Sequence, residues 1–366
     1  MSIDKLYDDI CGLAPVDSTE KKDDYRSILR ISLKKYEDLM ASVKTAKIIT
    51  DDDIKEVHKT CEKLKEIVKS EYQGLHSTAF TQFSNLLRGD GVSRALGSSI
   101  RFVTLKANEK PLYRMRIMEN RRDLKYTDLF HIPIDKRGIV NTNRYSAPGF
   151  PCLYLGTSIY ACWEELGRPS MSQSMVSRLK NGKDLHLIDL RVPTREQFKR
   201  DHKSYLRAFP LIITCMVKVK DTDTKASYKP EYCVPQLMME YVINNNVKHK
   251  TNVPISGIYY TSVFKKDDFK YSIDKLENIA IPIQAPLSSK KYCKELCAIF
   301  SITRPTCDEI EQARTGGYNT IAYDKTSKGM VLKQGIDMGY SNSSFGYLEE
   351  RLNDENLFPL QTIKDE

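Results

Sequence analysis

The stretch that decides the fold lies near the middle of the chain, where residues 144–156 read RYSAPGFPCLYLG and residues 158–166 read SIYACWEEL. An arginine precedes a Pro/Gly turn, a short apolar strand and a helical segment that Ser158 is suited to cap. Because proline restricts the backbone, such a turn fixes the directions of its flanking side chains at little entropic cost. This suits a site where an arginine and a carboxylate face one ligand. The alternative is a hairpin followed by an amphipathic helix with solvated acids.

On the N-terminal side, residues 17 to about 88 carry apolar side chains at helical spacing. Thr50, ahead of three aspartates, is a good helix N-cap because acids are favoured at the start of a helix. We predict a helical hairpin that either covers the following domain or joins two subunits. The glycines between residues 89 and 97 mark a boundary after it.

Beyond that boundary the pattern changes to short strand-like runs with two helices between them, at residues 158–166 and 235–243. The predicted strands are 101–105, 113–117, 153–155, 185–190, 211–219, 258–263 and 279–283, with two further pieces at 320–323 and 330–333 in the tail. Irregular strands with few intervening helices favour an α+β fold. We expect a helical region at 1–95, a central domain at 96–290 and an α/β appendage at 291–366.

The composition predicts a basic chain that can bury a core. The 366 residues include 57 Lys+Arg against 48 Asp+Glu, a formal charge of +9, and 40% are hydrophobic, which excludes wholesale disorder. The uncharged segment 145–163 is broken by prolines and glycines, so no membrane helix is expected, and the acidic first residues do not resemble a secretory signal. Nine scattered cysteines without paired His/Cys spacing predict reduced thiols, no metal and a cytoplasmic location.

Four segments, in order along the chain, resemble the RES domain family. They are Leu112–Arg116 (LYRMR), the stretch 144–166 quoted above, Glu231–Leu237 (EYCVPQL) and Gly257–Ser262 (GIYYTS). The resemblance covers about residues 100–285 and leaves the N-terminal helices and the tail outside it. It implies a core like that of ADP-ribosyltransferases, built of short mixed or antiparallel strands, with NAD as co-substrate.

The resemblance also implies which side chains bind NAD. Arg114 and Arg144 would bind its pyrophosphate, since guanidinium groups form charge-assisted, bidentate bonds with phosphate oxygens. Tyr154 would lie against the nicotinamide or its ribose with an apolar face and one polar tip. Tyr145 is a further cofactor-binding candidate, with packing as the alternative role.

The implied catalytic group comprises Arg114, an acid on the helix after Tyr154, and Ser262. Glu165 is the expected acid because an apolar residue follows it, as in the family. It would stabilise the oxocarbenium-like ribose as nicotinamide leaves. One helical step turns a side chain by about 100°, so Glu164 would face elsewhere, solvated or paired. Ser262 would position the ribose or the acceptor, or be a plain strand residue.

The implied activity is that of an NAD phosphorylase or NAD glycohydrolase, which cleaves the nicotinamide–ribose bond and passes ADP-ribose to phosphate or water. Such a toxin or defence effector would be restrained by an antitoxin or regulatory protein from another gene. One alternative is an ADP-ribosyltransferase that modifies a protein or nucleic acid. Another is a non-catalytic basic scaffold that binds nucleic acid or protein. A homo-oligomer could form through the N-terminal helices, and no membrane partner is expected.

Overall fold

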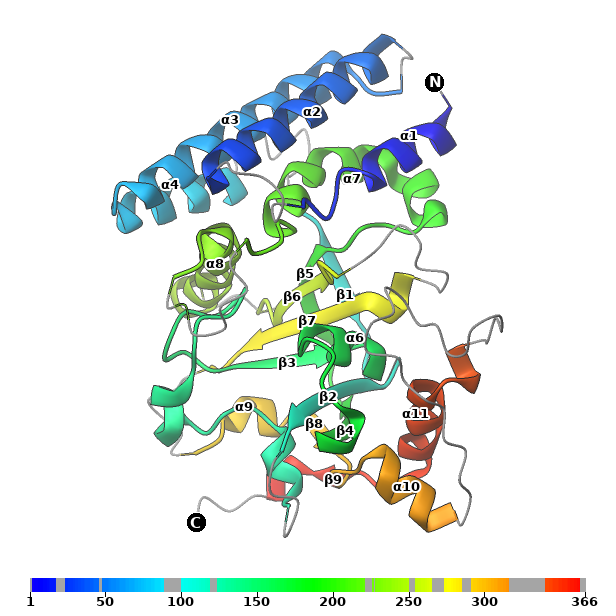
Figure 1. The fold of residues 1–366 in the computed structure, drawn as a ribbon. Helices are drawn as coiled ribbons and strands as arrows, with labels where there is room; N and C mark the ends of the chain where they lie inside the picture. Colours follow the sequence, from blue (N-terminus) through cyan, green and yellow to red (C-terminus); the bar gives the residue numbers. More distant parts are fainter. Residues whose placement is uncertain are drawn as a thin grey trace. The chain divides into compact units, whose positions relative to one another are not determined.

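The computed structural model forms two compact units, each of which combines helices with strands (Figure 1). Unit 1 comprises residues 1–103, 141–149 and 186–263, and unit 2 comprises 104–140, 150–185 and 264–366. The structure describes residues 2–17, 24–45, 48–88, 100–118, 124–220, 226, 228–249, 254–264, 273–284, 291–315 and 340–362. The predicted α+β class is confirmed, whereas the division at residues 95 and 290 stays a prediction. The predicted glycine boundary at 89–97 and the predicted strands at 320–323 and 330–333 lie outside the described residues.

Unit 1 begins with four helices, α1 (Ile3–Cys11), α2 (Tyr25–Thr45), α3 (Asp51–Tyr72) and α4 (His76–Arg88). The predicted hairpin is therefore present as α2 and α3, which contact one another. Thr50 caps α3 as predicted, because its side chain accepts from the N–H of Asp53 while the Asp53 carboxylate accepts from the N–H of Thr50. The helix α2 begins at Tyr25 rather than at residue 17, and the side chain of Asp24 caps it by accepting from the N–H of Ser27.

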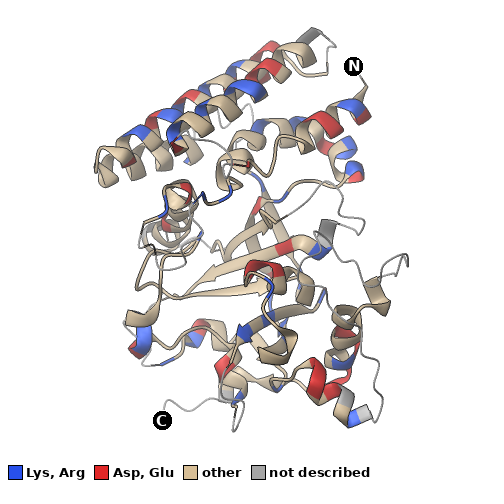
Figure 2. Ribbon diagram, viewed as in Figure 1, with Lys and Arg blue, Asp and Glu red and all other residues tan. Residues whose placement is uncertain are grey.

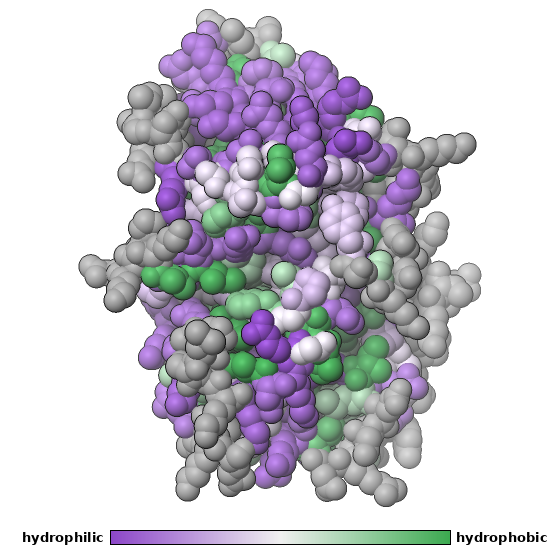
Figure 3. Space-filling model, turned by 90° about the vertical axis from the view of Figure 1, so that its left-hand side faces the viewer, coloured by the Kyte–Doolittle hydropathy of each residue, from purple (hydrophilic) through white to green (hydrophobic). Residues whose placement is uncertain are grey.

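The apolar stripes of this hairpin are buried inside unit 1. Tyr36 of α2 stacks on Phe209 at 5.6 Å between ring centroids and donates to the carbonyl of Leu206. Asp53 of α3 accepts from Nε of Arg207 at 2.7 Å. The hairpin therefore covers α7, and its joining of two subunits stays a prediction. Acidic and basic residues are interspersed along α2 and α3 (Figure 2), and the surface at the upper end of Figure 3 is mostly hydrophilic.

The prediction of a strand at 211–219 is wrong, because residues 211–215 form the end of the helix α7 (Arg195–Cys215) and residues 216–219 follow it outside any strand. A short buried apolar run cannot be assigned to strand or helix by periodicity alone. Ile212 and Ile213 are fully buried, and α7 contacts α1, α2 and α3. Tertiary packing thus outweighs both the strand preference of these β-branched residues and the presence of Pro210 within the helix.

The rest of unit 1 holds the strands β5 (Leu185–Leu190) and β6 (Gly257–Thr261), which pair in parallel. The helix α8 (Cys233–His249) contacts both α7 and β6 and is longer than the predicted segment 235–243. The strand β1 (Phe102–Leu105) lies where the chain passes from unit 1 to unit 2. All three strands were predicted from sequence within a few residues.

Unit 2 contains an antiparallel sheet in the order β7-β3-β2-β4-β8-β9. Its strands are β2 (Leu112–Ile117), β3 (Cys152–Gly156), β4 (Ser174–Asn181), β7 (Glu277–Pro282), β8 (Phe300–Ile302) and β9 (Phe358–Pro359). Sequence reasoning missed β4, since its run SMVSRLKN mixes polar and apolar residues without clean alternation. The strands β2 and β3 carry Arg114 and Tyr154.

The helices of unit 2 are α6 (Ile159–Glu165), α9 (Lys294–Cys297), α10 (Asp308–Thr315) and α11 (Ser344–Asp354). Short 3-10 turns occur at Tyr126–Leu129, Ile134–Ile139, Met171–Gln173, Ile273–Leu276, Tyr340–Asn342 and Leu360–Thr362, and in unit 1 at Pro230–Tyr232. The tail is thus integral to unit 2, because β8 and β9 extend its sheet and α11 contacts α6. The nine cysteines, all within the described residues, form no disulfide in this structure. In the described part of the chain, every helix is too short or too polar to span a bilayer.

Candidate functional site

Two arginines lie on one face of β2, because alternate residues of a strand point the same way. Nη1 of Arg114 donates to the carbonyl of Tyr154 on the neighbouring strand β3 at 2.7 Å. Nη2 of Arg116 donates to the carbonyl of Phe130 at 2.8 Å. Within the described ranges, neither guanidinium forms an ion pair with a carboxylate, and Nε of Arg114 is buried without a hydrogen-bond partner.

The electrostatics of this arginine pair favour an anion. Burial, followed by the charge of Arg116, lowers the pKa of Arg114 to about 9, and burial also lowers the pKa of Arg116. A buried charge without a counter-ion is destabilising, so an anion bound here would recover free energy. Arg116 was not selected from sequence, although the two-residue spacing LYRMR would have identified it.

His131 lies close to the arginine pair and is neutral. Its side chain is 0% exposed, and burial lowers its pKa to about 4, with the charges of Arg114 and Arg116 acting in the same direction. The N–H of Cys293 donates to Nε2, which requires the proton to be on Nδ1, where it is donated to the carbonyl of Ile132. Both ring nitrogens are therefore used structurally.

The two adjacent acids at the end of α6 have different environments. Glu164 is 2% exposed, accepts from the Tyr160 hydroxyl, and pairs with Arg168 through Nη2 at 2.7 Å and Nε at 2.9 Å. Positive φ angles at Gly167 and Arg168 turn the chain back so that this pairing is possible. Glu165 is exposed, and its Oε1 accepts from Nδ2 of Asn278 at 3.1 Å.

The helix α6 lies in close contact with the end of β3. Gly156 ends β3 where a Cβ atom would lie 2.7 Å from Sγ of Cys162, so only glycine permits this approach. Burial raises the pKa of the Cys162 thiol to about 12, and the charges of Arg114 and Glu165 both act on it. These two side chains therefore lie near the same buried thiol.

The C-terminal helix α11 also holds α6 in place. Glu349, 8% exposed, accepts from the N–H of Ile159 at 2.7 Å and from the Tyr340 hydroxyl at 2.6 Å. Phe345 packs on Trp163 at 5.3 Å between ring centroids, within one apolar cluster. Glu349 lies outside the region that resembles the RES family, so the sequence did not predict its contact with α6.

Unit 1 carries the other predicted site residues. Arg144 is buried, and its Nη1 donates to the carbonyls of Cys215 and Val217 at 3.0 Å each. Its guanidinium carbon lies 5.0 Å from the Tyr232 ring centroid. Arg144 thus has a structural role in unit 1, and its binding of a pyrophosphate stays a prediction.

Two further predicted residues of unit 1 are buried. The ring centroid of Tyr145 lies 4.6 Å from that of Tyr260 on β6, so the packing role considered for Tyr145 is present. Ser262 directly follows β6 and is fully buried. Nε2 of Gln236, in the EYCVPQL segment, donates to the hydroxyl of Thr142 and the carbonyl of Asn143, which anchors the loop that carries Arg144.

The structure therefore brings predicted residues together within each unit. Arg114, Tyr154 and Glu165 belong to neighbouring elements of unit 2, and Arg144 and Tyr145 share a loop of unit 1. Action of both sets on one ligand stays a prediction. Asn278 and Arg116 are the polar residues of this region that sequence reasoning missed.

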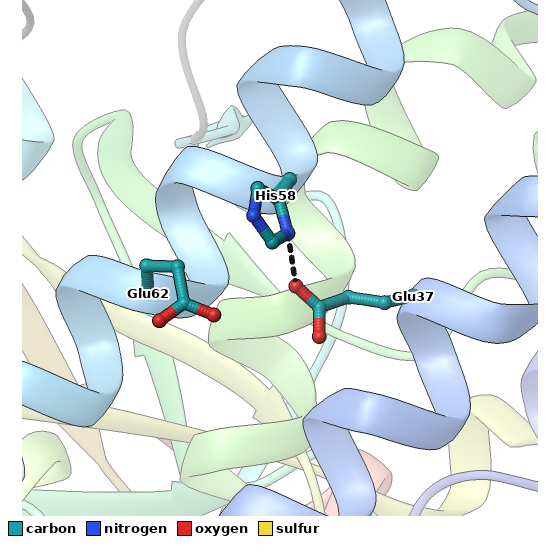
Figure 4. Close-up of side chains that lie close together, drawn as sticks. All are labelled: Glu37, His58 and Glu62. Atoms are coloured by element: carbon teal, nitrogen blue, oxygen red, sulfur yellow. Dashed lines mark hydrogen bonds and ion pairs between the residues drawn. The ribbon is translucent and has the colours of Figure 1, made fainter.

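A second polar cluster lies on the helical hairpin (Figure 4), where ligand atoms of Glu37, His58 and Glu62 all lie within 4.8 Å of one another. Nδ1 of His58 lies 2.6 Å from Oε1 of Glu37. Nζ of Lys65 approaches Glu62 at 2.7 Å and Glu37 at 3.4 Å, so an ammonium group already balances these acids. His58 and Glu62 are exposed, and the cluster resembles an ordinary surface ion-pair network.

Comparison with known proteins gives one informative match. A Bacillus subtilis (strain 168) protein named "Putative toxin YopC" is 35% identical over 218 residues, covering 55% of this chain and 47% of that protein. The chain thus spans about half the length of this relative. No family model matches the chain, and no solved structure matches it.

Proposed function

We propose that the chain is a toxin-type enzyme that consumes NAD by cleaving its nicotinamide–ribose bond. The observation that carries the proposal is the guanidinium of Arg114 beside Arg116, whose Nε is buried and which has no carboxylate partner among the described residues, on the strand that α6 contacts. A pyrophosphate supplies negative charge that balances the two guanidinium groups, and its oxygens accept the bidentate hydrogen bonds that guanidinium groups form. The 35% identical relative that is named as a toxin supports the biological role.

The proposed reaction breaks the bond between C1′ of the ribose and the nicotinamide nitrogen. The bonding electron pair leaves with nicotinamide, which neutralises its ring, and C1′ becomes oxocarbenium-like. Glu165 provides the negative charge that stabilises this centre. An oxygen of phosphate or water then bonds to C1′ and releases a proton to solvent, so that ADP-ribose or its phosphate ester forms.

Other residues are assigned from the family resemblance. Tyr154 would flank the nicotinamide end, Arg144 would supply a further guanidinium for the pyrophosphate, and Ser262 would orient the ribose or the acceptor. Tyr145 would support the ligand-binding loop through its contact with Tyr260. No metal is required by this chemistry, and the partner that restrains such a toxin would be an antitoxin or regulatory protein in the cytoplasm.

The experiment incubates the purified full chain with NAD, with and without phosphate, and measures free nicotinamide and the mass of the ADP-ribose product. Glu165→Gln is expected to reduce the rate about a hundredfold, because removal of one transition-state charge has this effect. Glu350→Gln is the matched control, since Glu350 is an exposed acid on α11 of the same unit. We expect it to retain the parent rate.

Three outcomes separate the candidate reactions. Free ADP-ribose indicates hydrolysis, and a phosphate-dependent product eighty mass units heavier (about the mass of one phosphoryl group) indicates phosphorolysis. Label that remains on macromolecule indicates ADP-ribosyl transfer. Folded protein that releases no nicotinamide in either buffer would overturn the proposed function.

A further inference from the structure

Asn278 is a buried polar residue near the start of β7, and its burial requires an explanation. It lies on β7, where it is 4% exposed and pairs directly with Gly156 of β3. Its neighbours Ile279 and Ala280 are fully buried. Asparagine is disfavoured in strands, and a buried amide is destabilising unless it is hydrogen-bonded.

The side chain of Asn278 has one hydrogen bond with the described residues. Nδ2 donates to Oε1 of Glu165 at 3.1 Å, across 113 residues of sequence. Glu165 is the last residue of α6 and is exposed, and holding such a long side chain in one rotamer costs conformational entropy. The bond therefore links a buried strand to an exposed carboxylate.

The geometry of the neighbouring elements makes this link possible. Gly156, opposite Asn278, has no side chain, and α6 lies so close to it that a Cβ atom would meet both Cys162 and the carbonyl of Ser158. The N–H of Thr157 donates to the carbonyl of Glu277 at 2.9 Å, which continues the pairing to the start of the helix. The helix and the end of β7 are thus fixed relative to one another.

We propose that Asn278 is a positioning residue that orients the Glu165 carboxylate for catalysis. The inference rests on the proposed function, in which Glu165 stabilises the positive ribose. An amide N–H that donates to one carboxylate oxygen fixes the plane of the group and favours its charged form. Its effect is therefore expected on turnover rather than on NAD binding.

The test compares Asn278→Asp and Asn278→Ala with Asn181→Asp. The aspartate at position 278 is isosteric but replaces the donor with a negative charge. Asn181 is the matched control, because it is 0% exposed, lies on β4 of the same sheet, and donates to the carbonyls of Lys106 and Lys183 rather than to an acid. Thermal unfolding gives the folded fraction of each variant.

We expect Asn278→Asp to lower kcat for nicotinamide release about a hundredfold and Asn278→Ala about tenfold, with the KM for NAD changed less than about threefold. Asn181→Asp is expected to melt at lower temperature and to keep the parent kcat per folded molecule. Unchanged kcat in both Asn278 variants, or a loss that appears equally in Asn181→Asp, would overturn the positioning role.

A second measurement does not depend on activity. In protein labelled with ¹³C at the glutamate carboxyl carbons, the Glu165 resonance is identified by its loss in Glu165→Gln. It is expected to move in both Asn278 variants and to stay in place in Asn181→Asp. A resonance that moves while the parent releases no nicotinamide would refute the proposed function alone, whereas a resonance that does not move would refute the inference about Asn278.

Discussion

The two adjacent acids of α6 allow a sharp prediction, because one is buried in an ion pair and the other is exposed. Replacing Glu164 with alanine removes both hydrogen bonds from Arg168 and the acceptor of the Tyr160 hydroxyl. The side chain of Arg168 is 22% exposed and that of Glu164 is 2% exposed. The variant thus removes the charged partner of a partly buried guanidinium and an acceptor of a buried hydroxyl, while Arg168 keeps its contacts with Tyr160 and the Trp163 ring.

The magnitude follows from these two losses. Breaking a buried ion pair costs about 3–5 kcal/mol, and partial access of water to Arg168 reduces this to about 2 kcal/mol. Loss of the Glu164 acceptor of the Tyr160 hydroxyl adds about 1 kcal/mol. A total of about 3 kcal/mol, at roughly 2–4 °C per kcal/mol for a domain of this size, lowers the melting temperature by roughly 6–12 °C.

The assay is thermal unfolding followed by near-ultraviolet circular dichroism, with Glu165→Gln as the control. Because Glu165 is exposed, its replacement is expected to shift melting by less than about 2 °C. Nicotinamide release per folded molecule should be retained by Glu164→Ala and lost by Glu165→Gln. Equal melting temperatures for the two variants, or activity that depends on Glu164 and not on Glu165, would refute the reasoning.

Two other predictions concern the surroundings of α6 and of the arginine pair. Glu349→Ala removes the acceptor of the Ile159 N–H and should loosen α11 from α6. A red shift in the fluorescence emission of Trp163, the single tryptophan, would report this loosening. Unchanged emission and an unchanged melting temperature would contradict the prediction. Burial lowers the pKa of His131 from 6.5 to about 4, so the unfolded chain binds more protons and stability falls as the pH drops from 6.5 towards 4. Urea titrations at pH 7 and pH 5 measure the free energy of unfolding, and its change between these pH values should be smaller in His131→Gln than in the parent. An equal change in the two proteins would exclude His131 as the source of the pH dependence.

Local signals in the sequence predicted the elements that carry the candidate site. The Pro/Gly turn, the strand at Leu153–Leu155 and the Ser158 cap specified β3 and α6, because turn and cap chemistry acts over a few residues. Thr50 specified the start of α3 in the same way. These elements needed no knowledge of distant contacts.

Features that depend on distant contacts could not be predicted. The stretch 211–219 has the composition of a strand, yet its residues 211–215 are helical in α7, which packs against the N-terminal helices. The bond from Asn278 to Glu165 spans 113 residues, and the one from Glu349 to Ile159 spans 190. A single asparagine or glutamate carries no sign of such a partner, so these positioning contacts required the structure.

The most direct test of the central claim is calorimetric titration of NAD into Glu165→Gln, which slows turnover, and into Glu165→Gln combined with Arg114→Gln. Arg114 has no carboxylate partner among the described residues, so its replacement should leave the melting temperature unchanged or raise it. The account predicts saturable binding of NAD to the single variant and binding about tenfold weaker or more in the double variant. Absence of NAD binding to the folded single variant, or equal affinity in the two proteins, would contradict it.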